Sequence, residues 1–244
     1  MTHHNLKVCA KALAFIGVAD GWLPQWGKRH AVVDELRRAS ESVLLNLAEG
    51  SRLRLRARKA QALDDALGST LECAACLDIA CIKKLGESSA IQEQKSCLWE
   101  ITLMLVALRK AWLSETLKKD PVDYQRSESD RPFHHERLDV YQAGLAFMRW
   151  FSALPGGRKL ADPFSRRIDQ VATAILLNIA EGNGRYSQLD QTRFLDLAAS
   201  ATVKGATYLD LWEHRAASPM LPVQTHPGHQ LLRRILAMRD QMME

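Results

Sequence analysis

The stretch Leu44-Leu45-Asn46-Leu47-Ala48-Glu49-Gly50 occurs twice in this chain. It returns 132 positions later as Leu176-Leu177-Asn178-Ile179-Ala180-Glu181-Gly182, in which Ile179 replacing Leu47 is the one change. The same offset aligns apolar residues on both sides of the phrase, such as Leu13 with Leu145 and Leu63 with Leu195. A repeat with a domain-sized period predicts a tandem duplication and not a solenoid.

The repeated phrase has the pattern of a helix end. Leucines run up to a glycine, and glycine is common just after a helix because it adopts a positive φ without steric cost. Asn46 and Glu49 lie three positions apart and therefore share a helix face. We expect both to hydrogen-bond to a neighbouring helix or to the following loop. A catalytic Asn–Glu pair is the other interpretation, but no His, Cys or Ser nucleophile accompanies both copies.

With its flanking residues the phrase resembles a known family. The segments 36–50 and 175–187 look like the "four helix bundle protein" family, whose genes were first noticed inside intervening sequences of bacterial large-subunit ribosomal RNA. The accessory variability determinant of diversity-generating retroelements is similar to that family. The resemblance covers both halves of the chain. It implies a four-helix bundle for each half and association into closed rings, and it says little about activity.

Helical spacing of apolar residues runs through the chain and predicts an all-α fold of two tandem up-and-down antiparallel four-helix bundles. We expect residues 1–120 to form the first bundle, 121–133 a linker and 134–244 the second bundle. Each half is long enough to bury a core of its own, and one merged core would contradict this organisation. The expected helices are 5–20, 28–49, 57–85, 90–118, 136–153, 163 to the second phrase, 188–215 and 228–243, with breaks at 21–24 and 218–228.

Composition describes an ordinary globular protein. The 244 residues are 47% hydrophobic and 25% charged, with a net charge of +5 and most of the cationic excess in the first half. Five cysteines, an odd number without disulfide-like spacing, favour a reducing cytoplasm. Cys73 and Cys76 form a C-x-x-C inside a helical pattern, where small core residues are a better interpretation than zinc or redox chemistry. No apolar stretch approaches the roughly 20 residues that span a membrane.

Residues that could carry catalysis are not arranged in a known pattern. The chain has no phosphate-binding glycine loop, no H-E-x-x-H and no nucleophile elbow. The only repeated histidine pairs, His3-His4 and His134-His135, consist of adjacent residues that point apart on a helix and chelate poorly. We therefore expect no catalytic residue, no cofactor and no metal.

The strongest functional signal is a run of cations after the first phrase. Their like charges repel unless they are solvated or neutralised by anions, and guanidinium groups bind phosphate oxygens in pairs. We predict contacts with the RNA or DNA backbone, and the alternative is a solvated loop. The predicted contact residues are Arg52, Arg54, Arg56, Arg58 and Lys59, with Arg185 and Arg193 as secondary candidates in the second copy.

These observations predict a non-catalytic protein that binds structured nucleic acid through its backbone. The resemblance implies docking of a reverse transcriptase and its template RNA in a diversity-generating retroelement. In the alternative, the outer apolar residues of the bundles close an oligomer, and the arginines only keep a loop soluble. An enzyme is a distant third interpretation, which a stoichiometric metal would revive.

Overall fold

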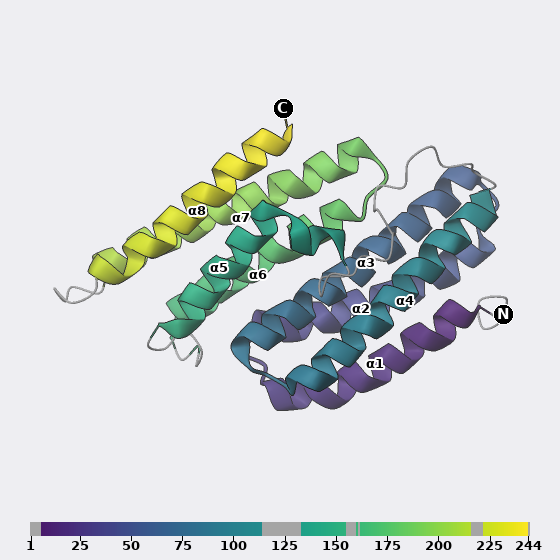
Figure 1. Cartoon of the computed structure of the whole chain (residues 1–244), viewed down its shortest axis with the longest axis horizontal. Helices are drawn as coiled ribbons and strands as arrows, with labels where there is room; N and C mark the ends of the chain where they lie inside the picture. Colours follow the sequence, from purple (N-terminus) through teal and green to yellow (C-terminus); the bar gives the residue numbers. More distant parts are fainter. Residues whose placement is uncertain (1–5, 114–132, 155–159, 161, 216–221, 244) are drawn as a thin grey trace.

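The computed structural model describes residues 6–113, 133–154, 160, 162–215 and 222–243, and no strand occurs in these ranges. Eight α-helices and a 3₁₀ turn follow one another (Figure 1). They are α1 (Lys7–Trp26), α2 (Ala31–Arg52), α3 (Arg56–Lys83), α4 (Ser88–Leu113), η2 (His134–Arg137), α5 (Asp139–Ala153), α6 (Pro163–Asn183), α7 (Gln188–Arg215) and α8 (Pro222–Met243). The all-α prediction is confirmed for these residues. None of these helices is long and apolar enough to cross a membrane.

The helices fall into two sets of four. Within α1–α4 each helix contacts the next and α4 closes on α1, and α5–α8 make the same set of contacts, with α8 closing on α5. Figure 1 shows the two sets side by side, with α3 running between α6 and the rest of the first set. The contacts that join the sets come from α3 with α5 and α6, and from α2 with α6.

The core corrects one expectation. The sequence predicts a separate core for each half, whereas the buried side chains form one contiguous cluster that includes residues of both sets. The reason is that α3 is buried on nearly all sides: it packs within its own set and against α5 and α6. The two halves therefore share their apolar interior along α3. The predicted linker lies outside the described residues.

A buried ion pair crosses between the sets. Lys83 at the end of α3 donates to Asp169 of α6, and both side chains are almost fully buried. The other Asp169 carboxylate oxygen accepts from the backbone N–H of Ala31, at 3.0 Å, at the start of α2. One carboxylate of the second half thus satisfies a cation and a helix N-terminus of the first.

The first helix continues through the predicted break at Gly21 to Pro24. Pro24 lies inside α1, which ends only at Gly27, where φ is +83°. Leu23 and Trp26 are buried, and Trp26 stacks on Trp22 with ring centroids 5.6 Å apart. Packing of this last turn outweighs the hydrogen bond that proline removes.

The glycine that ends each copy of the repeated phrase does not have the predicted role of a left-handed helix cap. Gly50 and Gly182 lie inside the last turns of α2 and α6, and Gly27 is the one glycine with a positive φ in the described residues. A Cβ on Gly182 would lie 2.9 Å from Cβ of Phe194, and one on Gly50 would lie 3.3 Å from Ala62 and from Trp112. Glycine is needed here because the following helix packs closely, and not as a left-handed cap.

The predicted ends of the helices in the second half agree in part with the structure. Pro163 opens α6 as predicted, after an N-cap in which Asp162 accepts from the N–H groups of Phe164 and Ser165. The predicted range of α7 matches the structure. By contrast α8 begins at Pro222 and contains Pro227, so the predicted loop is shorter than expected on its C-terminal side.

Candidate nucleic-acid interface

The predicted cations gather at the corner where α2 turns into α3. We call Arg52, Arg54, Arg56 and Arg58 the basic corner. Arg52 ends α2, Arg54 lies in the connection, and Arg56 and Arg58 lie in the first turn of α3. All four side chains are exposed. The structure thus brings the four arginines to one end of the first helix set, on neighbouring elements.

The start of α3 favours an anion. Its N-cap residue is Leu55, which provides no side-chain cap, and its first turn contains no acidic residue. The helix dipole places partial positive charge at this end, where cations are unfavourable and anions are stabilised. Arg56 and Arg58 add full positive charges to the same turn, so a bound phosphate would relieve this repulsion.

Within the described part of the chain, the first acids that follow the basic corner in sequence are paired elsewhere. Asp64 accepts from Nε of Arg109 at 2.7 Å, and Asp65 pairs with Arg185 of the second set. None of the four arginines forms an ion pair with another described residue. Their charge is therefore available to a partner.

The other three predicted residues lie apart from this corner. Lys59 packs over the Trp112 ring at 4.8 Å and is only half-exposed. Arg193 is exposed on α7 near Phe194. Arg185 is buried between the sets, where it pairs with Asp65 and, at 2.5 Å, with Glu181. Because its guanidinium is already paired and shielded from solvent, we leave Arg185 out of the proposed interface.

The polar residues of the phrase follow the expectation only in part: Glu181 pairs with Arg185 of the following loop as predicted, whereas both asparagines bond within their own helices. Asn46 donates to Ser42 and Asn178 to the carbonyl of Ala174, each within its own helix. Glu49 is exposed, whereas Glu181 pairs with Arg185. In neither copy does a neighbouring histidine, serine or cysteine complete a nucleophile–base arrangement among these contacts.

Sequence reasoning missed a buried polar cluster at the junction of the two sets. The Lys95 ammonium lies between Asp78, at 2.5 Å, and Glu136, and the Tyr141 hydroxyl donates to Asp78 at 2.9 Å. His135 lies against the Tyr141 ring, and burial lowers its pKa well below the ordinary value, so it is neutral at pH 7. Asp78, His135 and Glu136 are close enough to share a metal ion. The ammonium, however, already supplies the cation that the carboxylates need.

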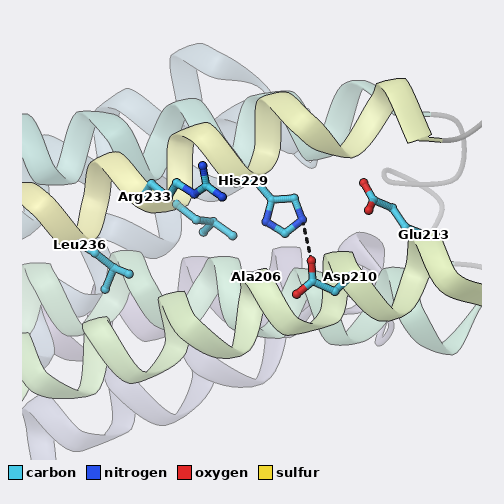
Figure 2. A pocket seen from close by; sticks show the side chains of 7 residues that line it. Ala206, Asp210, Glu213, His229, Arg233 and Leu236 are labelled. Carbon is cyan, nitrogen blue, oxygen red and sulfur yellow. Dashed lines mark ion pairs between the residues drawn. The ribbon is translucent and has the colours of Figure 1, made fainter.

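A second group of ionisable side chains lines a groove between α7 and α8 (Figure 2). Nε2 of His229 on α8 lies 3.1 Å from Asp210 on α7, and Glu213 lies one turn further along α7. The groove encloses about 400 Å³. These three side chains could hold a metal ion, although Asp210 is largely exposed. Asp210 is the repeat counterpart of Asp78, so each copy places an aspartate against a basic residue of its last helix.

The cysteines are free thiols, as the sequence predicts, and exposed arginines on α2 form ion pairs along their own helix. All five cysteines are free, and Cys73 and Cys76 are buried in the core. Burial raises the pKa of both thiols well above the ordinary value, which makes them poor nucleophiles and poor metal ligands. Arg37 and Arg38 pair with Asp34 and Glu35 on the surface of α2.

Comparison with known families gives one match. Residues 5–107 match the family model described as 23S rRNA-intervening sequence protein, which spans α1 to α3 and most of α4. Comparison with curated proteins and with solved structures found no match. The first half of the chain is therefore similar to the 23S rRNA-intervening sequence proteins, and the repeated phrase links the second half to the first.

Proposed function

We propose that this chain, whose two sets of four helices share one core along α3, binds RNA through its sugar-phosphate backbone and catalyses no reaction. The observation that carries the proposal is the basic corner. Four exposed arginines surround an uncapped helix start, and among the residues that the structure describes none of the four forms an ion pair with an acid. The family description of the first half refers to ribosomal RNA, which supports RNA over DNA as the partner.

Backbone charge, and not base sequence, would set the affinity. Each guanidinium can form two hydrogen bonds with a phosphate and releases condensed counterions when it binds. If all four arginines engage phosphates, log K falls with log salt at a slope of about −3 to −4. Readers of single-stranded sequence need aromatic platforms for stacking. The Trp112 ring, which lies against Gly50 near this corner, is covered by Lys59.

The finer part of the proposal rests on the family resemblance. We propose that the protein serves as an accessory factor that docks a reverse transcriptase and its template RNA in a diversity-generating retroelement, in the cytoplasm. Free cysteines agree with that compartment. A reverse transcriptase gene beside a gene with a variable repeat would support this role, and a neighbourhood without either would remove it.

The central experiment is a salt titration of binding to a labelled duplex RNA hairpin. Replacing Arg52, Arg54, Arg56 and Arg58 together by glutamine should weaken binding and reduce the salt slope by about 1 for each lost contact. The charge-matched control replaces four exposed arginines elsewhere, Arg149, Arg167, Arg233 and Arg234, by glutamine. Equal effects of the two variants would show non-specific attraction to net charge and would remove the basic corner as the site.

A second candidate function is a protein scaffold that binds no nucleic acid. The observation in its favour is the set of large apolar side chains that stay exposed on α1, α2 and α7. Absence of RNA binding by the parent protein at low salt would favour this alternative. A stoichiometric metal in purified protein would instead point to the Asp78 or Asp210 group and reopen the question of catalysis.

A further inference from the structure

A groove at the junction of the two helix sets is lined by an exposed thiol and two cations. It encloses about 310 Å³ between the last turn of α3 and the end of α5, a volume at the lower end of the range for small-molecule sites. The residues that line it are Cys81, Ile82, Lys84, Arg149, Ser152 and Ala153. We call these six residues the thiol groove, and none of the six is acidic.

The positive charge of the thiol groove is not neutralised within the described part of the chain. Lys84 and Arg149 are exposed, and neither forms an ion pair with another described residue. The ends of α3 and α5 lie here, and each helix end carries about half a negative charge. Together these ends offset roughly one of the two cations. The groove therefore keeps a positive balance that favours an anion.

Ser152 brings a buried polar group to the thiol groove. It is only 8% exposed, and its hydroxyl has no hydrogen-bond partner among the described residues. A hydroxyl in a helix can donate to the carbonyl four residues earlier, as Thr202 does to Ala198. Ser152 does not, and a buried polar group without a partner is unfavourable. Its hydroxyl is therefore free to donate to a ligand in the groove.

Lys84 has a backbone conformation that glycine adopts more easily. It follows the last residue of α3 with a left-handed φ of 55°, and its N–H donates to the carbonyl of Cys81 at 3.1 Å. Glycine is common at this position because it has no Cβ to be crowded. The chain instead has a lysine here, which adds an ammonium close to Cys81 in spite of the strain.

We propose that Cys81 is a modification site that forms a mixed disulfide with a small anionic disulfide of the glutathione class. The Cys81 thiolate attacks one sulfur of glutathione disulfide. A bond forms between Sγ and that sulfur as the S–S bond of the reagent breaks, and the second glutathione leaves as a thiolate that takes up a proton. Cys81 is oxidised, and the departing glutathione is reduced.

The thiol groove matches the charges of the bound glutathione. Its two carboxylates would pair with Lys84 and Arg149, which bind them as exposed cations in reach of Cys81. The Ser152 hydroxyl would donate to one of the remaining oxygens and so gain the partner that it lacks. The inference does not rest on the proposed RNA binding.

The other four thiols do not share these surroundings. Three of them are buried. The fourth, Cys97, is partly exposed in a groove that also contains Glu93 and Glu100, and burial raises the pKa of its thiol. Lys11 lines that groove too, but its ammonium is paired with Glu100. Cys97 is therefore the control thiol within the same protein, with acids in place of free cations.

The first test treats the folded full chain with glutathione disulfide and follows the intact mass and the labelled peptide. We expect one glutathione for each chain, attached to Cys81 and released by dithiothreitol. Cys81→Ser should abolish the addition, and Cys97→Ser should leave it unchanged. No addition to the parent, or addition to Cys97 in preference to Cys81, would overturn the proposal.

The second test separates recognition of an anion from mere exposure of the thiol. Rate constants are measured for the Cys97→Ser protein with dithiobis(nitrobenzoate), a dianionic disulfide, and with dithiodipyridine, a neutral one. The ratio of the two rate constants cancels the fraction of thiolate. Adding Lys84→Gln with Arg149→Gln should lower this ratio about tenfold, because each exposed ion pair contributes a factor of a few. Ser152→Ala should lower it about threefold through the lost hydrogen bond.

The matched control removes two exposed cations elsewhere. Arg233→Gln with Arg234→Gln on α8 lowers the net charge by the same amount and should leave the ratio unchanged. An equal fall in this control would show attraction to net charge alone and would overturn the proposal. So would a ratio at Cys81 no higher than the ratio at Cys97 in the Cys81→Ser protein. Circular dichroism of each variant checks that the fold is kept.

Discussion

The two copies of the repeated phrase end in opposite surroundings. At the end of the second copy and just beyond it, Glu181, Gly184 and Arg185 pack against α3 and become part of the interior. At the end of the first copy Glu49 is exposed, and the chain continues into the exposed basic corner, which begins at Arg52. The same seven-residue helix end therefore forms a structural junction in one half and a charged surface in the other. Position within the tandem, and not the phrase itself, decides which role it has.

The largest expected effect comes from breaking the junction at its buried ion pair. Asp169→Ala would leave the Lys83 ammonium buried without a partner and the Ala31 N–H without its acceptor. Loss of one partner of a buried pair costs about 3–5 kcal/mol. The free energy of unfolding, from urea titration, should fall by that order.

The repeat supplies the control for this prediction. Arg37 is the counterpart of Asp169 and is exposed, so Arg37→Ala should change the free energy of unfolding by no more than about 0.5 kcal/mol. A double variant, Lys83→Met with Asp169→Leu, should recover most of the loss because no charge remains buried. Equal stability of Asp169→Ala and Arg37→Ala would contradict the burial of this pair.

A smaller effect is expected at the two glycines of the phrase. Valine at Gly182 would place its Cβ 2.9 Å from Cβ of Phe194, which is fixed to the α7 backbone, whereas valine at Gly50 meets Ala62 and the Trp112 ring at 3.3 Å. Overpacking of this kind costs about 1–3 kcal/mol. Thermal unfolding should show a larger loss for Gly182→Val than for Gly50→Val. The reverse order, or no loss at either glycine, would contradict close packing as the reason for glycine.

Much of the helical framework follows from the sequence, because local signals decide it. The stripe of apolar residues and the Asp162-Pro163 start define α6, and the bounds of α7 follow from its periodicity. Local signals fail where tertiary packing decides. Pro24 and Pro227 lie inside helices, and the two phrase glycines serve packing with a following helix.

The junction was harder to predict because charged residues form much of it. Lys83, Lys95, Asp169 and Arg185 are the kind of residue that periodicity assigns to the surface, yet each is buried against a partner from the other half. One signal was present in the sequence. Positions such as Asp169 and Arg185 break the similarity between copies, since their counterparts are Arg37 and Leu53. Loss of similarity at regular helical spacing marks a face that only one copy buries.

The smallest expected effect is on the pH dependence of stability, and it comes from Glu72. The counterpart of Glu72 in the second half, Lys204, is exposed on α7. Burial, and then the nearby carboxylates of Glu181 and Glu35, raise the pKa of Glu72 from 4.5 to about 8, against the opposing influence of Arg38 and Arg185. A raised acid pKa means that the folded state holds a proton which the unfolded chain has released. The contribution of Glu72 to stability is therefore present below about pH 4.5 and is lost as the pH rises toward 8.

Replacing Glu72 by glutamine removes this titration while it keeps the shape of the protonated acid. We expect Glu72→Gln to match the parent near the lower end of this window and to be the more stable protein at and above its upper end. Urea midpoints of both proteins across the window measure the difference, and taking the difference cancels titrating groups that do not interact with Glu72. Lys204→Gln, the matched change at the exposed counterpart of Glu72 on α7, should show no such trend. A constant difference between Glu72→Gln and its parent at all pH values would mean that Glu72 is ionised at the junction. The face of α3 that meets α6 would then be more open to water than the burial of Glu72 in the structure indicates.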